Sequence, residues 1–440
     1  MSDAELGLLL LAVTLLVLFS GLPIAWGLTL VAVGFLVVFA GPGSLAILSQ
    51  TFISELASFA LLTIPLFILL GAAIGGTAAG RDIYESFHRL LARVPGGLVI
   101  ANILACGVFS AICGSSPATA AAIGKVGVPE MLKRGIRPSL ATGAICAGGT
   151  LGILIPPSVT MILYGIATET SIGRLFLSGV IPGIMLVSLF ALYAWLTSLF
   201  DRAAMVRMAE ERRYSLAEKL GGLVKVSPFL AIIVAIAYFM YGGIATPSEI
   251  AAIAAILALA LVVLIYRTWR PRELWAIFRD TVRESTMIML IIAAAALFSY
   301  MMSLLYITQT AAEAIVSFEM NRWVLMFVIN LFLLLAGCFL PPVAIILMLM
   351  PILLPVLEQN DFDLIWFCVM LTINLEVGLI TPPVGLNLYV LRGVAPQVPL
   401  MTVLKGSMPF VVIMVGFMVL LCIFPEIATW LPDTLMGKGR

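Results

Sequence analysis

Two short segments of the sequence resemble each other: GILIPPS at residues 152–158 and GLITPPVG at residues 378–385. Each places two adjacent prolines inside an apolar run that is long enough to cross a membrane. A proline in a helix interior removes a backbone donor and clashes with the preceding turn, which costs about 3 kcal/mol. The pattern therefore predicts two membrane helices that are broken in the same way.

The composition places most of the chain in lipid. Of its 440 residues, 62% are hydrophobic and 11% are charged, with a mean hydropathy of +1.17, whereas a soluble domain carries roughly 25% charged residues. The apolar runs do not alternate in polarity, so we expect an all-α polytopic membrane protein. The net charge of +1 argues against a nucleic-acid partner, and the six cysteines lie in apolar runs without metal-ligand spacing. The first apolar run lacks a basic leader, so we expect a retained helix rather than a signal peptide.

Two of the apolar runs are interrupted in the middle. They cover residues 98–131, broken at 114–117, and residues 322–357, broken at 340–342. Each is long enough for two half-spans, so each is predicted to form a re-entrant hairpin that returns to the face it entered. Uninterrupted spans are predicted at residues 5–20, 22–40, 57–78, 139–165, 175–199, 227–243, 249–267, 285–305, 363–391 and 405–425.

Basic residues predict the orientation, because cytoplasmic loops of membrane proteins carry an excess of Lys and Arg. If both interrupted runs are re-entrant, every basic cluster falls on one face. We therefore predict an external N-terminus, with hairpin 98–131 entered from the cytoplasm and hairpin 322–357 entered from the periplasm. The basic clusters lie at residues 81–93, 125–137, 202–225 and 267–283, and the segments 41–56 and 242–249 have no Lys or Arg.

The double-proline segments also mark an internal repeat. Gly378 lies 226 residues after Gly152, and the same shift brings the two interrupted runs into register. Five crossings in the first half would invert the second half, as in alternating-access transporters with a site at the repeat interface. Chance recurrence of Gly and Pro in apolar sequence is the alternative. The predicted parts are a first repeat at 1–205, a cytoplasmic connector at 206–226 and a second repeat at 227–440.

Each predicted repeat combines scaffold helices, a hairpin and a broken helix, at 139–165 in the first repeat and 363–391 in the second. The first repeat also contains residues 82–94, whose apolar side chains share one helical face while charged side chains take the other. We interpret this segment as an interfacial arm helix between moving and fixed parts. Its polar face carries His88, which we expect to be solvated rather than a ligand.

Broken helices at membrane depth are tolerated only where they are buried in protein or line a wet cavity. Carbonyl groups freed by the proline pairs suit a small cation, and half-helix N-termini attract anions. Two such elements in opposite orientation predict two ion sites that flank one carboxylate substrate. The first hairpin tip adds the hydroxyl groups of Ser110, Ser115, Ser116 and Thr119, although serine is also a common packing residue in membranes.

One carboxylate, Glu376, precedes the second break inside an apolar span. An ionisable residue there is a functional hypothesis by default. We favour the structural alternative, in which Glu376 accepts from freed backbone amides, with Asn374 and Asn387 as candidates for the same role. The sequence contains no nucleophile–base constellation, phosphate loop or metal cluster, so an enzyme is not expected.

Three long motifs carry a family resemblance: GVFSAICGSSPATAAAIGKVGVPEM at 107–131, AGGTLGILIPPSVTMILYG at 147–165 and NLEVGLITPPVGLNLYVLRG at 374–393. In this order they resemble the large membrane subunit of tripartite ATP-independent periplasmic (TRAP) transporters, over nearly the whole chain. The resemblance implies an elevator mechanism in the bacterial inner membrane, with a transport domain that slides against a scaffold and with sodium (Na+) driving uptake. It also implies two partners, a periplasmic substrate-binding protein and a small four-helix membrane subunit.

The resemblance also implies roles for particular residues. One sodium site is expected to use Ser110 with the backbone of Gly152, Ile155 and Pro157. The other is expected to use Gly337, Gly378 and Thr381 with the backbone of Val384. The residues expected to face the substrate are Ser115, Ser116, Ser158 and Thr160.

The sequence of the second hairpin narrows the range of expected substrates. Sialate-type members of the family carry an aspartate four residues after the glycine that opens this hairpin, and this sequence has Pro341 there. The form FLPPVAIILM at 339–348 is closer to the dicarboxylate-type branch, so a small organic acid is expected. Two other readings stay open: a self-sufficient sodium–dicarboxylate transporter that needs no partner, and a membrane scaffold or intramembrane enzyme that transports nothing.

Overall fold

The computed structural model describes residues 3–201, 212–317 and 320–437, and within them the chain forms helices, turns and loops without a β-strand. Among these residues, six helices are long and apolar enough to cross a membrane, and the bent pair Pro42–Leu56 and Phe59–Gly75 (58°) adds a seventh if it is one span. Five further apolar helices are shorter, at 10–17 residues. The predicted all-α, multi-pass membrane class is confirmed.

The helices before residue 201 are α1 (Asp3–Phe19), α2 (Ile24–Phe35), α3 (Ile47–Leu56), α4 (Thr63–Gly75), α5 (Ala79–Leu91), α6 (Gly97–Cys113), α7 (Ser116–Lys133), α8 (Pro138–Thr150), α9 (Val159–Ala167) and α10 (Ile172–Leu199). The later helices are α12 (Leu216–Tyr241), α13 (Pro247–Leu264), α14 (Pro271–Leu304), α15 (Ile307–Ser317), α16 (Arg322–Gly337), α17 (Pro342–Gln359), α18 (Leu364–Leu379), α19 (Leu386–Val394), α20 (Leu400–Ile423) and α21 (Glu426–Met436).

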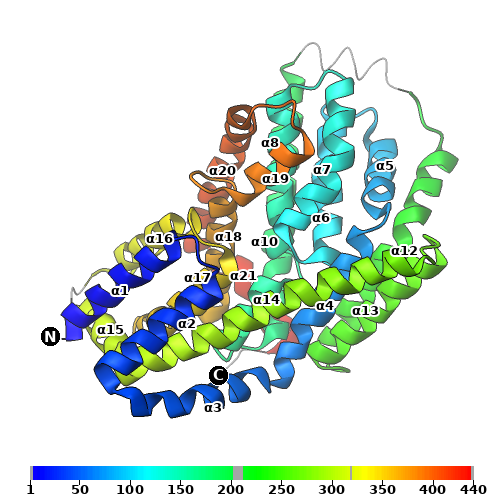
Figure 1. Cartoon of the computed structure of the whole chain (residues 1–440). Helices are drawn as coiled ribbons and strands as arrows, with labels where there is room; N and C mark the ends of the chain where they lie inside the picture. The colour runs from blue at the N-terminus through cyan, green and yellow to red at the C-terminus, as the bar shows by residue number, and fades with distance from the viewer. Residues whose placement is uncertain (1–2, 202–211, 318–319, 438–440) are drawn as a thin grey trace.

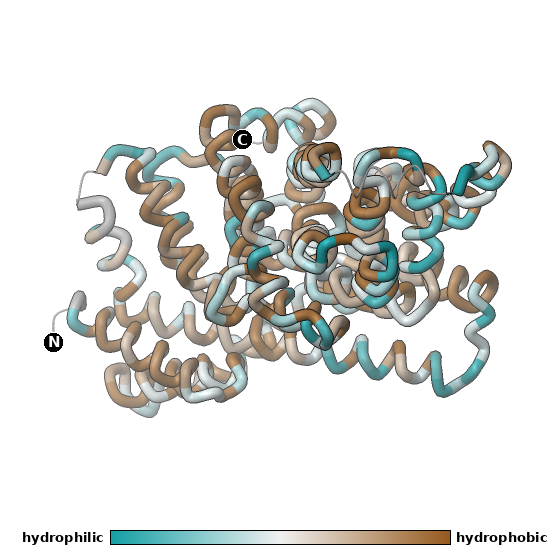
Figure 2. The backbone as a smooth tube through the Cα atoms, turned by 90° about the horizontal axis from the view of Figure 1, so that it is seen from above, coloured by the Kyte–Doolittle hydropathy of each residue, from teal (hydrophilic) through white to brown (hydrophobic). Residues whose placement is uncertain are grey.

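The long helix α14 crosses the molecule diagonally in Figure 1 and packs against α2, α3 and α4 from the first part of the chain and against α17 from the last. On its other side lies a cluster in which α8 packs against α6, α7 and α20. Hydrophobic residues cover most of the helices (Figure 2). Large apolar side chains also point outward, among them Leu16, Val224 and Phe327, which suits a surface in contact with lipid or another membrane subunit.

The order of elements recurs along the chain. Helix α7 begins at Ser116 and α17 at Pro342, and 342 − 116 = 226. Helix α8 begins at Pro138 and α18 at Leu364, and 364 − 138 = 226. This is the spacing that separates the two double-proline segments in the sequence.

Some helices lie where the sequence predicted loops. The segment 41–56 contains α3, α14 begins well before the predicted span at 285–305, and α12 begins inside the predicted connector at 206–226. Helices α15 and α21 have no counterpart among the predicted spans. The reason why these helices were not predicted is clearest in α14, where charged residues interrupt the apolar pattern. Ile277, Thr281 and Ser285 nevertheless repeat at i, i+4 and i+8 and form a buried stripe.

Helix α5, at the position of the predicted arm, is held against α12 and the loop after α13. Ser86 Oγ donates to the Gly222 carbonyl at 2.7 Å. The Asp82 carboxylate lies 3.4 Å from Lys225 Nζ and accepts from the Tyr266 hydroxyl at 2.9 Å. Burial and the adjacent Asp82 carboxylate raise the pKa of Tyr266, which keeps this phenol a neutral donor. Polar contacts therefore fasten α5 to its neighbours.

The expectation of a solvated His88 is wrong. Its side chain is 6% exposed. It stacks on Tyr84 with ring centroids 5.9 Å apart and meets the edge of Tyr214 at 6.0 Å. The polar face of α5 is covered at this point by a segment that lies 126 residues further along the chain (214 − 88 = 126), which a helical-face analysis of α5 alone does not reveal.

Candidate functional site

The first break is stabilised by its own residues. Between α8 and α9 the chain leaves α-helical geometry, with a 3-10 turn at Leu151–Ile153 followed by the double proline. Ser158 Oγ donates to the Ile153 carbonyl at 2.6 Å and accepts from the Met161 amide at 3.3 Å. The serine therefore caps α9, and its hydroxyl is already engaged with backbone on both sides of the break.

The tip of the hairpin formed by α6 and α7 lies directly on this break. A Cβ atom added at Gly152 would lie 2.7 Å from the Ser115 carbonyl oxygen and 3.0 Å from the Ser116 amide nitrogen. Only glycine permits this approach between two backbones. At Gly114 an added Cβ would lie 2.8 Å from the Pro157 carbonyl oxygen. The structure thus brings Gly152 and Pro157 of the first predicted ion site against the hairpin tip.

Ser110 lies one turn before this tip. It is fully buried, and its carbonyl accepts from the Gly114 amide at 3.0 Å. Its hydroxyl has no hydrogen-bond partner within residues 3–201, 212–317 and 320–437. A buried hydroxyl without a partner is costly, so this oxygen is available to a ligand such as a cation. Ile155, the fourth residue of the predicted set, belongs to the break itself.

The second break is built in a related way. A Cβ atom added at Gly378 would lie 2.7 Å from the Gly337 carbonyl oxygen. The Val384 amide donates to the Cys338 carbonyl at 3.1 Å, which ties the turn after α16 to the chain beyond the proline pair. Thr381 Oγ1 donates to the Val377 carbonyl at 2.6 Å. The structure therefore assembles Gly337, Gly378, Thr381 and Val384 around one helix break.

A buried amide joins the two halves of the chain. Asn387 Nδ2 donates to Ser116 Oγ at 2.7 Å and to the Cys146 carbonyl at 3.3 Å. Asn387 and Ser116 are both fully buried. The Tyr164 hydroxyl makes a second connection by donating to the Leu364 carbonyl at 2.8 Å. Ser116, predicted to face substrate, is thus a hydrogen-bond acceptor between the second broken helix and the first hairpin.

Glu376 and Asn374 differ in their hydrogen bonding. The Asn374 amide donates to the Asn330 carbonyl at 2.8 Å and joins α18 to α16. Glu376 is fully buried, and neither of its carboxyl oxygens accepts a hydrogen bond from the described residues. The structural role that the sequence favoured for Glu376, as an acceptor for freed amides, therefore finds no support.

A cavity of about 690 Å³ lies beside the first hairpin tip. Of the four residues predicted to face substrate, Ser115 lines this cavity, while Ser116, Ser158 and Thr160 are buried outside its lining. Several residues that line this cavity are absent from the predicted site, among them Lys125 on α7 and the acidic side chains of α14. The polar and charged residues of the lining are Thr77, Cys113, Ser115, Lys125, Tyr266, Thr268, Glu273, Asp280 and Glu284.

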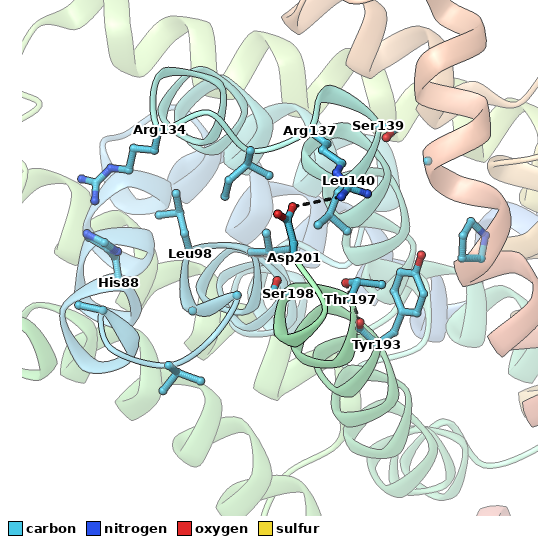
Figure 3. A pocket seen from close by; sticks show the side chains of 18 of the residues that line it. His88, Leu98, Arg134, Arg137, Ser139, Leu140, Tyr193, Thr197, Ser198 and Asp201 are labelled. Carbon is cyan, nitrogen blue, oxygen red and sulfur yellow. Dashed lines mark hydrogen bonds and ion pairs between the residues drawn. The ribbon is translucent and has the colours of Figure 1, made fainter. Parts of the chain in front are cut away.

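A smaller cavity, of about 190 Å³, lies where α6, α8, α10 and α20 meet (Figure 3). Arg137 and Asp201 face each other in it, with 3.3 Å between guanidinium and carboxylate. His88 and Arg134 line the cavity at the left of Figure 3. None of the residues predicted to bind ion or substrate lines this cavity, so it is distinct from the two breaks.

Comparison with known proteins identifies the family. The family model described as "Tripartite ATP-independent periplasmic transporter, DctM component" matches residues 11–427. The chain belongs to this family. The TRAP resemblance found in the three motifs is therefore confirmed, and the relatives are transporter permeases rather than enzymes.

Individual relatives cover most of the chain. The C4-dicarboxylate TRAP transporter large permease protein DctM of Pseudomonas aeruginosa is 35% identical over 399 residues, covering 91% of this chain and 92% of that protein. The isethionate TRAP transporter permease protein DctMQ of Oleidesulfovibrio alaskensis is 30% identical, covering 94% of this chain and 64% of that protein. The solved YdaH transporter of Alcanivorax borkumensis has a TM-score of 0.63 at 16% identity, covering 97% of this chain and 99% of that one, and shares the fold.

The bond between the halves leads to a stability prediction. Asn387→Ala removes the donor to Ser116 Oγ, and hydrogen bonds between membrane helices contribute on the order of 1 kcal/mol. We expect a lower thermal unfolding midpoint for the detergent-purified protein. The control is Asn360→Ala, because Asn360 bonds only the Val356 carbonyl within its own helix among the described contacts. Equal shifts for the two variants would contradict a bond that joins the halves, as would full additivity of Asn387→Ala with Ser116→Ala.

Proposed function

We propose that this chain is the large permease subunit of a sodium-coupled secondary transporter that imports a small organic acid of the C4-dicarboxylate class across the bacterial inner membrane. The observation that carries the proposal is the seating of each hairpin tip on one helix break, through Gly152 in the first half and Gly378 in the second. The 35% identical relative named for C4-dicarboxylates supports the substrate class. Pro341, in place of the sialate-type aspartate, supports it as well.

The chemistry of the two breaks favours sodium over protons. Unwound backbone carbonyls and hydroxyl groups are the ligands with which broken membrane helices coordinate sodium. The first site would combine Ser110 Oγ with carbonyls of Gly152, Ile155 and Pro157, and none of these residues titrates. The second site would combine Gly337, Gly378, Thr381 and Val384, which do not titrate either. The buried hydroxyl of Ser110, with no partner among the described residues, supports the first site most directly.

The proposed mechanism is an elevator built from two inverted repeats, residues 1–205 and 227–440, joined by the segment 206–226. The recurrence of α7, α8, α17 and α18 at 226 residues supports the repeat. In this mechanism the hairpins and broken helices form the transport domain, and α13 and α14 belong to the scaffold. The cavity of about 690 Å³ lies between the first hairpin tip and α14, which is where such a domain boundary would run.

The proposed assembly contains two partners, a small four-helix membrane subunit and a periplasmic substrate-binding protein. The DctMQ relative supports the membrane partner, since this chain covers 64% of that protein and leaves length for a fused segment. Outward-facing apolar side chains, such as Trp26 and Phe327, offer a surface for it. The competing hypothesis is a transporter that works without partners, which uptake by this chain alone would select.

The topology can be tested by cysteine labelling in a background that lacks the native cysteines. We expect Ser44→Cys and Gly243→Cys to react with an impermeant reagent from the periplasm, because the segments 41–56 and 242–249 carry no Lys or Arg. Arg213→Cys, in a basic cluster, is the control that should react only from the cytoplasm. Labelling of position 44 or 243 only from the cytoplasm would overturn the proposed orientation.

Sodium coupling can be tested by uptake into proteoliposomes that contain the permease, its small subunit and its binding protein. Radiolabelled succinate uptake should fall to background when external sodium is replaced by potassium or choline. The reason is that the oxygen ligands at both breaks lack a titratable group that could carry a proton instead. Full uptake driven by a pH gradient alone would reject sodium coupling and would assign the driving proton to Glu376.

A substitution at Thr381 distinguishes a role in ion binding from a role in helix capping. Thr381→Val keeps the shape and removes the oxygen at the second break, so the sodium concentration for half-maximal uptake should rise about tenfold, equivalent to about 1.4 kcal/mol. Thr372→Val is the matched control. Its hydroxyl makes the same kind of bond to a carbonyl one turn earlier in α18, at 2.8 Å, away from the break. An unchanged sodium titration in well-folded Thr381→Val protein would remove Thr381 from the site.

A further inference from the structure

One face of α7 leads away from the first hairpin tip. Ser115, Ala118, Ala122 and Lys125 follow each other at spacings of three and four residues, which places them on one helical face. All four line the cavity of about 690 Å³. At 1.5 Å per residue, Lys125 stands about 15 Å from the tip. Between them the face carries only methyl groups, so a small solute meets no bulky side chain on this wall before it reaches the lysine.

Lys125 also lines a second hollow, which we name the basic groove. This groove has a volume of about 540 Å³ and lies between α5 and α7. The same face of α7 continues into it through Pro129 and Lys133, four and eight residues after Lys125. Lys125 is therefore the residue at which the cavity beside the hairpin tip meets the groove. The full lining is Arg81, Tyr84, Glu85, His88, Arg89, Lys125, Val126, Pro129, Glu130, Lys133, Arg134, Arg212 and Tyr214.

The charges of the groove favour an anion. Its lining contains six Lys and Arg side chains and two Glu side chains, a formal excess of four positive charges. Both glutamates are already paired, Glu85 with Arg89 at 3.5 Å and Glu130 with Arg134 at 2.8 Å. A concave surface of one sign concentrates ions of the opposite sign. Lys125 itself makes no ion pair with an acidic residue of the described chain, so its ammonium group is free to meet a carboxylate.

Acidic side chains of α14 line the larger cavity together with Lys125. Glu273 lies 3.7 Å from Arg270 and Asp280 lies 3.0 Å from Arg279, so Glu284 is the acidic lining residue without an ion pair among the described residues. A carboxylate solute in this cavity is repelled by Glu284 and attracted along the α7 face toward Lys125. The general excess of basic residues on cytoplasmic loops explains a positive surface. It does not explain a lysine within a helix at the junction of two cavities, one of which begins at the hairpin tip.

We propose that the basic groove is the cytoplasmic release path for the anionic substrate and that Lys125 selects carboxylates at its entrance. The inference rests on the proposed function, because it takes the cavity beside Ser115 as the substrate's position when the permease faces inward. It adds a binding site for a small carboxylate that is separate from the two helix breaks. Lys125 captures the solute as it leaves the hairpin tip, and the cations beyond it draw the solute onward to the cytoplasm.

The test is succinate exchange in proteoliposomes with the small subunit and the binding protein, the latter added only outside. External binding protein selects molecules with their periplasmic face outward, so the lumen corresponds to the cytoplasm. Lys125→Gln should raise the luminal succinate concentration for half-maximal exchange at least fivefold. The external succinate concentration for half-maximal exchange should stay unchanged. The dependence of exchange on sodium concentration should stay unchanged as well. Lys125→Arg should restore the wild-type value, and high luminal ionic strength should shrink the difference, since salt screens exposed charges.

Lys219→Gln is the matched control, because Lys219 lies on α12 outside the lining of the cavity and of the groove. The inference is overturned if Lys125→Gln leaves the luminal succinate concentration for half-maximal exchange unchanged, or if Lys219→Gln changes that concentration equally. It is also overturned if Lys125→Gln shifts the luminal and external concentrations for half-maximal exchange together. Wild-type protein that exchanges no succinate at all would overturn the proposed function and this inference with it. Wild-type exchange with an unaffected Lys125→Gln variant would overturn the inference alone.

Discussion

Backbone groups that leave a helix inside a bilayer have no water to bind, so the protein itself must satisfy them. At the first break Ser158 holds the Ile153 carbonyl and caps the next helix. At the second break the turn after α16 contributes the Cys338 carbonyl to the Val384 amide. Break and hairpin therefore require each other in lipid, and the glycines at their contacts allow backbones to meet without side chains between them. The backbone groups proposed as ligands at both breaks are positioned by this mutual dependence.

Much of this arrangement can be predicted from the sequence because proline and glycine act on the backbone next to them. The double prolines predict both breaks, and the interrupted runs predict both hairpin tips. The engagement of the Ser116 hydroxyl cannot be predicted in this way, because its partner lies far away in the sequence. Ser116 resembles a free ligand until Asn387, 271 residues away, is seen to donate to it. Hydropathy also misses the start of α14, because charged residues lower the average where this helix lines the cavity. Lys125 belongs to a basic cluster in the sequence, but its place in the cavity lining depends on tertiary packing.

The two breaks differ in ways that a shared motif does not suggest. At the first break Ser158 caps the helix that follows, and this serine is fully buried. The second begins its outgoing helix at Gly385 in left-handed geometry, and Val384 beside it is 44% exposed. In the proposed mechanism, an ion in the second break therefore lies nearer to solvent or to a partner than an ion in the first. Unequal access would make the two ions bind and leave in a set order.

The bond from Asn387 to Ser116 has a consequence for energy conversion. It ties the second broken helix to the first hairpin, so the two proposed ion sites are fastened to each other. If they travel as one body, neither can return across the membrane while the other stays behind. The two proposed ion sites then change sides of the membrane in a single step, so one ion cannot cross in one step and the other in a second. In the proposed mechanism, a buried amide in the middle of the protein thereby couples the movements of the two ion sites.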